Sequence, residues 1–245
     1  MRILFVDHTT GHDPKKLYEK PTGGTLTSLT LVPEYLASKG HEVYVKSTYE
    51  KNEDINGVHY INSDVNIPTW NVVVFNRNVL PKDFIEYNKT IGAKIVWWLH
   101  DIVDLRYLED DAYTHVDHIV ALSEYCKKTF SDFYSIDTNK FSVIPNGVDK
   151  TIFYPGKYED RNSNLYVMAS ALIKGFIPIE TMYNNLQRVL PNLDFRIYSS
   201  QALHSLVNSP VQDGFLNYMR DRGAQVYYPV SQPVLAGILR KAWCL

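Results

Sequence analysis

Short apolar runs alternate with longer amphipathic stretches along this chain, and that alternation limits the possible folds more than any other feature. Runs such as Ile3–Val6 and Val72–Phe75 are continuously apolar instead of alternating with polar residues. A strand buried on both faces of a parallel sheet has this pattern. Five further strands are expected in the same part of the chain, at Glu42–Lys46, Val58–Ile61, Lys94–Leu99, His118–Leu122 and Phe141–Ile144.

Helix-length segments fill the intervals between these strands. In Leu26–Lys39 the apolar residues recur at helical spacing, and Gly40 stands where a C-terminal cap belongs. Regular alternation of strands and helices predicts a doubly wound α/β domain. The other helices are expected at Lys82–Thr90, Leu105–Tyr113 and Ser123–Tyr134.

A second α/β unit follows a linker-like stretch at Gly147–Asn164, which is rich in polar residues, proline and glycine. We therefore predict two domains, residues 1–150 and residues 151–245. Because the second ends directly after a helix, with Trp243–Leu245 resembling the start of another strand, we expect its sheet to be incomplete. Its strands are expected at Leu165–Ala169, Asp194–Ser199 and Gln225–Tyr228, and its helices at Ile179–Val189, Phe215–Asp221 and Gln232–Ala242.

Charge and cysteine usage exclude several classes of protein. The formal net charge is -2, and a general nucleic-acid binder would instead carry a basic surplus. Cys126 and Cys244 lie far apart without zinc-ligand spacing, which favours a reducing compartment and argues against a thiolate zinc site. No apolar stretch reaches the ~18 residues of a membrane span, and the N-terminal run is too short for a signal peptide. We expect a soluble, cytoplasmic protein without a metal.

The first strand–helix connection contains Pro21–Thr25, with the sequence PTGGT. Two glycines at the start of a helix let the backbone approach an anion, and the helix N-terminus offers unpaired N–H groups. A flexible loop that needs glycine only for its turn is the alternative. The connection is too long for the dinucleotide-binding GxGxxG motif and lacks its third glycine, which disfavours a nicotinamide enzyme.

Polar residues follow two of the apolar strands. His100 and Asp101 come after KIVWWL, and Asn76 and Arg77 come after VVVF. Open α/β sheets bind ligands at the carboxyl ends of their strands, where a histidine can bind a sugar hydroxyl or transfer a proton. Arg77 could hold a phosphate or carboxylate. For His100, the alternative is a structural role beside a helix start at which Asp101 is the capping residue. For Arg77, the alternative is a surface ion pair.

The remaining candidates carry weaker signals. Ser123 after IVAL is most simply a helix N-cap, and Lys174 before Gly175 is either a diphosphate contact or an ordinary turn. His8 is expected near the cleft, and the spacing of His115 and His118 does not favour a metal site. The other histidines are interpreted as surface or loop residues: His12, His41, His59 and His204.

Taken together and in order, these motifs resemble the family-four retaining glycosyltransferases, whose two Rossmann-like domains form the GT-B fold. The matching pieces are GGT before a helix, SKGHEVYV, WWLHD, IVALSEY, VIPNGVDKTIFYP and ASALIKGF, and they extend over essentially the whole chain. IPNGVD, with Phe153 and Pro155 after it, is the most specific, because it marks the crossing between the two domains of that family.

The resemblance implies a role for each matching residue. Gly23, Gly24 and Thr25 would form the loop that closes near the donor phosphates, and His100 would contact the transferred sugar. Lys174 would hold the diphosphate, and Asn146 would shape the interdomain turn. The nucleotide would sit mainly on the C-terminal domain and the acceptor on the N-terminal domain. No cofactor or divalent metal would be needed, since basic side chains and helix amides neutralise the leaving group.

Two departures from the family pattern limit what this chain is expected to do. Ala169 or Ser170 stands where many members carry an arginine, and the Glu-x7-Glu motif that holds the donor sugar would lie beyond Leu245. We therefore expect this chain to be a fragment with little activity alone. The longer enzyme would act on a glycan, a lipid or a small-molecule acceptor. Peripheral association with a membrane is compatible with such acceptors. The alternatives are a non-catalytic paralogue that binds nucleotide or glycan and, more remotely, a nucleotide-sugar epimerase.

Overall fold

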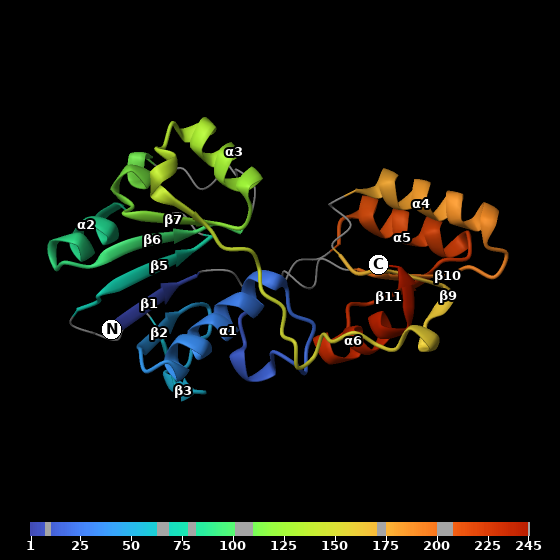
Figure 1. Ribbon diagram of the computed structural model, residues 1–245, viewed down its shortest axis with the longest axis horizontal. Coiled ribbons are helices and arrows are strands. Elements are labelled where there is room, and N and C mark those ends of the chain that lie inside the picture. Colours follow the sequence, from blue (N-terminus) through green and yellow to red (C-terminus); the bar gives the residue numbers. More distant parts are fainter. Residues whose placement is uncertain are drawn as a thin grey trace. The chain divides into compact units, whose positions relative to one another are not determined.

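The computed structural model describes residues 1–7, 11–62, 69–77, 82–100, 110–170, 175–199 and 208–244, without the side chains of residues 110–112 and 244. Two compact units divide the chain. Unit 1 comprises Met1–Lys15 and Gly24–Gly147, and unit 2 comprises Lys16–Gly23 and Val148–Leu245. Each unit is an α/β structure around a sheet (Figure 1), which confirms the predicted fold class of two parallel-sheet units.

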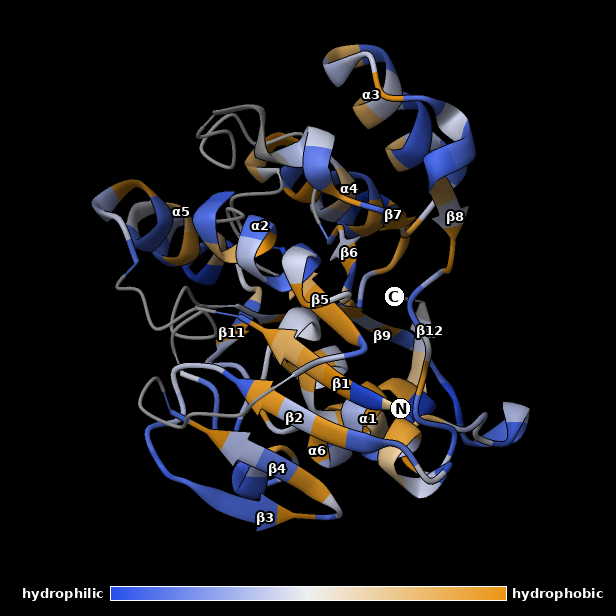
Figure 2. Cartoon of the chain, turned by 90° about the vertical axis from the view of Figure 1, so that its left-hand side faces the viewer, coloured by the Kyte–Doolittle hydropathy of each residue, from blue (hydrophilic) through white to orange (hydrophobic). Residues whose placement is uncertain are grey.

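Unit 1 is built on an eight-stranded sheet in the order β3-β4-β2-β1-β5-β6-β7-β8. All neighbouring strands are parallel except β3 and β4, which form an antiparallel edge. Figure 2 shows the apolar character of its central strands. The strand bounds are β1 (Arg2–Val6), β2 (Glu42–Lys46), β3 (Glu53–Ile55), β4 (Val58–Ile61), β5 (Val72–Asn76), β6 (Lys94–Trp98), β7 (His118–Ala121) and β8 (Phe141–Val143).

Helices cover both faces of this sheet. Leu26 and Leu29 of α1 pack with Phe5 and Val74 in one apolar cluster, whereas Ile85 of α2 and residues of α3 pack in a second cluster on the other face. The glycine expected to cap α1, Gly40, has a positive φ of 84°. The bounds are α1 (Gly24–Ser38), α2 (Lys82–Thr90) and α3 (Glu124–Tyr134), with short 3-10 helices at Pro14–Lys16, Asp110–His115 and Thr138–Lys140.

Unit 2 has a four-stranded parallel sheet in the order β11-β10-β9-β12. Ile179 of α4 and Leu216 of α5 pack on Phe195 and Ile197, while Ile238 of α6 packs against the opposite face. The expected strand near Trp243 is present as β12. The bounds are β9 (Asn162–Met168), α4 (Phe176–Val189), β10 (Asp194–Tyr198), α5 (Pro210–Asp221), β11 (Gln225–Tyr227), α6 (Gln232–Lys241) and β12 (Ala242–Cys244), with a 3-10 helix at Tyr158–Asp160.

His12, interpreted as a surface or loop residue, does lie in the loop after β1, but it is not on the surface, because it is buried in unit 1 and only 5% exposed. Its Nδ1 lies 2.7 Å from Ser47 Oγ, and its Nε2 lies 3.1 Å from Thr30 Oγ1. The Thr30 hydroxyl donates to the Leu26 carbonyl and is therefore an acceptor for the imidazole. His12 thus joins the loop after β1 to α1 and to the end of β2, and its burial lowers its pKa to about 4.

Candidate functional site

Three neighbouring strands of unit 1 place Asp7, Asn76 and Trp98 in one row. Val6 pairs with Phe75, so Asp7 follows β1 beside Asn76, and Asn76 pairs directly with Trp98. Residues in register on parallel strands share a face of the sheet. Trp98 packs in the apolar cluster that contains α1, so this row lies at the carboxyl edge of the sheet on the α1 face.

The row contains polar atoms that are fully enclosed. Asp7 and Asn76 are both 0% exposed, and the Asn76 amide nitrogen donates to the Asp7 carboxylate. Within the described part of the chain, neither Asn76 Oδ1 nor Trp98 Nε1 has a hydrogen-bond partner, although both are buried. Buried polar atoms are nearly always paired, so these two atoms indicate a place for a polar ligand or an ordered water.

His100 lies beside this row. Its ring is 4.6 Å from the ring of Trp98, at an interplanar angle of 49°, and the side chain is half-buried. The structure thus brings the predicted residues Asn76 and His100 together at one sheet edge. Asp101, the predicted neighbour of His100, lies outside the described residues.

Arg77 follows Asn76 in an unusual backbone conformation, with φ of 67°. Its N–H donates to the Trp98 carbonyl at 2.9 Å, which extends the β5–β6 pairing past the end of β5. Residues other than glycine adopt this left-handed region uncommonly, and such positions cluster at ligand sites. The turn that carries Arg77 is therefore held in place by the same strand pair that positions Asn76 and Trp98.

The start of α1 lies at the same edge, because this helix connects the carboxyl end of β1 to the beginning of the parallel strand β2. A Cβ on Gly24 would meet no atom within 4 Å, so open space adjoins the helix N-terminus. Gly24 and Thr25 belong to unit 1, whereas Gly23 groups with unit 2. The N-terminal amides of α1 are suited to hydrogen-bond an anion or a hydroxyl oxygen.

Two other predicted residues occupy different environments. Ser123 is the N-cap of α3, and its side chain accepts a hydrogen bond from the Cys126 amide at 3.0 Å. Ser123 therefore caps this helix, as the simpler interpretation of its position predicted. Asn146 is exposed on the segment that follows β8, one residue before the end of unit 1.

In unit 2, a pocket of about 320 Å³ lies at the carboxyl ends of β10 and β11. The Ser199 side chain in its lining is buried, and its Oγ has no partner among the described residues. Tyr228 is 80% exposed there, while Tyr227 stacks on Tyr198 with ring centroids 5.0 Å apart. The pocket therefore combines an aromatic surface with a buried hydroxyl. Its other lining residues are Asn208, Asp213, Leu216, Asn217, Arg220 and Val226.

The N-terminus of α4 also lies at this edge. Its N-cap is Gly175, with φ of 151°, and a Cβ there would approach Pro178 to 3.2 Å. Glycine is therefore favoured where the chain enters the helix. The N–H groups of Phe176 and Ile177 in the first turn of α4 can hydrogen-bond an anion, whereas Pro178 has no N–H to donate. Lys174, the predicted diphosphate contact, lies outside the described residues.

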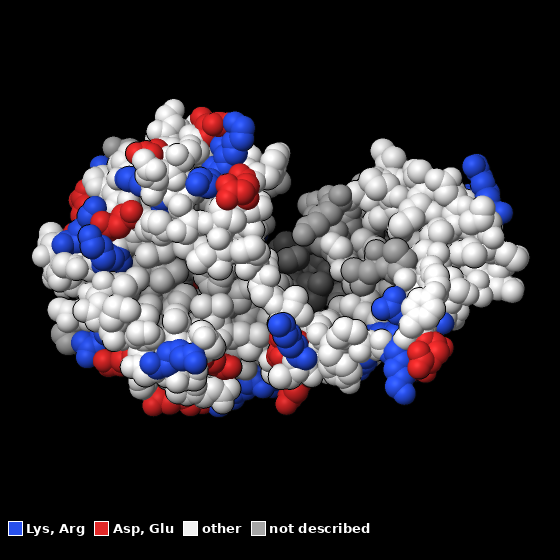
Figure 3. Space-filling model, in the orientation of Figure 1, with Lys and Arg blue, Asp and Glu red and all other residues white. Residues whose placement is uncertain are grey.

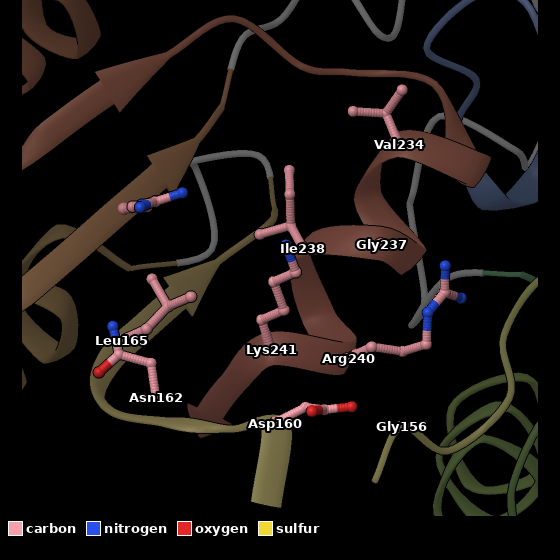
Figure 4. Close-up of a pocket in the computed structure, with 10 residues that line it drawn as sticks. Gly156, Asp160, Asn162, Leu165, Val234, Gly237, Ile238, Arg240 and Lys241 are labelled. Atoms are coloured by element: carbon pink, nitrogen blue, oxygen red, sulfur yellow. The ribbon is translucent and has the colours of Figure 1, made fainter.

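A larger pocket of about 880 Å³ lies elsewhere on unit 2, near the amino end of β9 and the end of α6. Figure 4 shows Lys241 extending beside Ile238, with Leu165 and Asn162 on the strand side. Parallel sheets bind ligands at the opposite, carboxyl edge. We therefore place the candidate site of unit 2 at the smaller pocket, which lies beside Ser199 and Tyr228.

Neither a strongly charged face nor a membrane-spanning helix is seen in the described part of unit 1 that Figure 3 shows. Basic and acidic side chains are interspersed over the face of unit 1 shown in Figure 3. Among the described helices, none has both the length and the apolarity needed to cross a membrane. His115 and His118, the two histidines whose spacing was considered for a metal site, have different neighbours. His118 lies 2.9 Å from Ser142 Oγ, and His115 lies 3.9 Å from Glu86.

Residues 72–151 match the family model Glycosyltransferase Family 4. This chain resembles the family 4 glycosyltransferases. The matching range contains the Asn76–Trp98–His100 edge and the IPNGVD segment, so the resemblance rests on the part of unit 1 that carries the candidate site. No curated protein sequence matches the chain significantly.

Solved structures show that the resemblance to these glycosyltransferases extends to the fold. A glycosyltransferase from Rickettsia africae matches 98% of this chain and 71% of its own, with 16% identity and a TM-score of 0.66. Sucrose-phosphate synthase from Thermosynechococcus elongatus matches 99% of this chain and 74% of its own, with 11% identity and a TM-score of 0.66. HepE from Anabaena, in complex with UDP-glucose, matches 96% of this chain and 71% of its own, with 14% identity and a TM-score of 0.60. The fold is GT-B-like.

Proposed function

We propose that this chain belongs to a glycosyltransferase that moves a sugar, with retention of anomeric configuration, from a nucleotide-diphosphate sugar to a glycan, lipid or small-molecule acceptor. The observation that carries the proposal is the family 4 match over residues 72–151, which includes His100 at a carboxyl sheet edge. The GT-B-like fold supports it.

Unit 2 would bind the donor. The amides at the start of α4, together with Lys174, would neutralise the diphosphate without a metal ion. The pocket beside Ser199 and Tyr228 would take the base, whose ring can stack on an exposed tyrosine. The related fold of HepE has been solved with UDP-glucose and with UDP, which makes uridine nucleotides the first probes to use.

Unit 1 would contribute to the sugar chemistry. The His100 imidazole stands against Trp98 at the edge of the sheet, where it can hydrogen-bond a sugar hydroxyl. The first amides of α1 can hydrogen-bond further oxygens at the same edge. We propose that the anomeric configuration is retained without a covalent intermediate between the sugar and the protein, because we assign no side chain as nucleophile.

Substituting Lys174 by alanine tests the donor site. The affinity for the preferred nucleoside diphosphate should fall by about 1.5–3 kcal/mol, because a charge-assisted hydrogen bond to the diphosphate is lost. Calorimetry with UDP, GDP and ADP on the wild-type and variant chains measures this change.

The matched control is Lys241→Ala, which removes a lysine from the larger pocket at the end of α6. We expect it to leave nucleotide affinity unchanged. If Lys241→Ala weakens binding and Lys174→Ala does not, the donor occupies the larger pocket and the assignment of the carboxyl edge is wrong. Binding without turnover of any nucleotide sugar would favour the non-catalytic alternative.

A further inference from the structure

We propose that a hydrogen bond from Tyr18 to Asp149 makes Tyr18 a positioning residue for the loop that enters α1. The segment Lys16–Gly23, the strap, directly precedes this helix and groups with unit 2, although the chain on either side of the strap belongs to unit 1. The inference rests on the proposed function only for what the start of α1 would bind. The attachment of the strap depends only on contacts of described residues.

The strap is an ordered turn that is attached through one side chain. The Tyr18 hydroxyl donates to Asp149 Oδ2 at 2.8 Å. Within the strap, the Glu19 N–H donates to the Lys16 carbonyl at 3.1 Å, and the Leu17 side chain is buried, with 4% exposed. The strap therefore has a defined conformation, and Tyr18 joins that conformation to Asp149.

Asp149 is a strong and oriented acceptor. Its other oxygen, Oδ1, accepts from the Thr151 N–H at 2.9 Å and from the Thr151 hydroxyl at 2.6 Å. The hydrogen bonds from the Thr151 and Tyr18 hydroxyls lower the pKa of Asp149 below its ordinary value, so the carboxylate is ionised at neutral pH. Hydrogen bonds to a charged acceptor are stronger than those between neutral groups.

The segment that carries Asp149 is fixed to α6 of unit 2. Arg240, in the last turn of α6, donates from Nη1 to the Ile152 carbonyl at 3.1 Å, and its guanidinium lies 4.3 Å from the centre of the Tyr154 ring. Gly156 lies so close to the same helix end that a Cβ there would be 2.8 Å from the Arg240 carbonyl oxygen. Through Asp149, the strap is therefore joined to a part of unit 2 that is packed on a helix.

The residues before the strap are attached to unit 1 instead. His12 lies within hydrogen-bond distance of Ser47 and Thr30, and Lys15 forms an ion pair with Glu53 on β3. The chain thus passes from anchors on unit 1 to an anchor on unit 2, and it returns to unit 1 at the start of α1. The few residues between Tyr18 and α1 reach at most about 20 Å when extended, so the hydrogen bond restrains the PTGGT segment that they contain.

Hydrogen–deuterium exchange of the whole chain tests this attachment. Tyr18→Phe and Asp149→Ala should each speed exchange of the amides in Lys16–Thr25 about five- to tenfold, the effect of one lost hydrogen bond. The double variant should exchange no faster than either single variant, because both substitutions remove the same bond. Asp149→Asn keeps an acceptor oxygen and should restore most of the protection.

Thr151→Val is the matched control, since it removes a hydroxyl from Asp149 and leaves Tyr18 in place. We expect this variant to keep the wild-type exchange rate in the strap. A comparable increase in the control, wild-type exchange in both single variants, or additive effects in the double variant would overturn the proposal.

The wild-type chain provides a test that needs no substitution. Its Glu19 and Lys20 amides, which both donate to the Lys16 carbonyl, should be protected. Exchange of these amides at the rate of an unstructured peptide would overturn the proposal even if a variant fails to fold. Titrating the same wild-type sample with UDP separates the two proposals, because a failure to bind UDP would count against the proposed function only.

Discussion

Replacing Phe195 by alanine should lower the free energy of unfolding of unit 2 by about 3–5 kcal/mol, the usual cost of removing a fully buried aromatic ring. Phe195 is the second residue of β10 and is 1% exposed, and its ring packs edge-on against the Tyr183 ring with centroids 5.3 Å apart. Small domains are stable by only about 5–15 kcal/mol. A loss of this size would therefore remove a large part of the stability of the unit that is proposed to bind the donor.

Urea denaturation, followed by circular dichroism and by nucleoside diphosphate binding, measures the effect. Phe133→Ala is the control, since this phenylalanine on α3 is 54% exposed and its loss opens no enclosed cavity. The control should change stability by less than about 1 kcal/mol. Similar losses in the two variants would mean that Phe195 is not packed as the core of unit 2 requires.

Acid should destabilise unit 1 through His12. Burial lowers the folded-state pKa of this histidine from 6.5 to about 4, and the charge of Asp13 partly opposes the shift. Because the folded state binds its proton less readily than the unfolded state, the stability from His12 is complete above about pH 6.5 and is lost as the pH falls toward 4. Between about pH 7 and pH 4 the loss should be about 3 kcal/mol.

Comparison with His12→Gln isolates this contribution from that of the carboxylates, which also titrate in the same range. Urea denaturation at the two pH values should show a smaller loss of stability on acidification in the variant than in the wild-type chain. Equal losses in the two proteins would show that His12 protonates without cost in the folded state and is not enclosed by Ser47 and Thr30.

Most strands could be predicted from the sequence, because continuous apolar runs such as Val72–Phe75 have few other stable locations than a buried parallel strand. The edge strand β3 was not predicted. Its sequence, Glu53–Ile55, has a single apolar residue, and its structure depends on antiparallel pairing with β4. Burial of His12 was also missed, since its partners Thr30 and Ser47 lie far along the chain and only the fold brings them to the imidazole.

Part of the candidate site could be predicted from the position of residues after apolar strands. That rule placed Asn76 and His100 at one edge correctly. It did not select Asp7 or Trp98, because their roles depend on the register between β1, β5 and β6, which no local pattern specifies. The functions of all these candidates remain predictions: Gly23, Gly24, Thr25, Asn76, Arg77, His100, Asp101, Asn146 and Lys174.

Amide chemical-shift changes on titration of the whole chain with UDP would show directly where the nucleotide binds. We expect the affected amides to cluster at the carboxyl edge of unit 2, at the start of α4 around Gly175 and beside Ser199 and Tyr228. Shifts centred instead on Asn162 and Lys241, or no shifts at saturating nucleotide, would contradict the assignment of a nucleotide-sugar site to that edge.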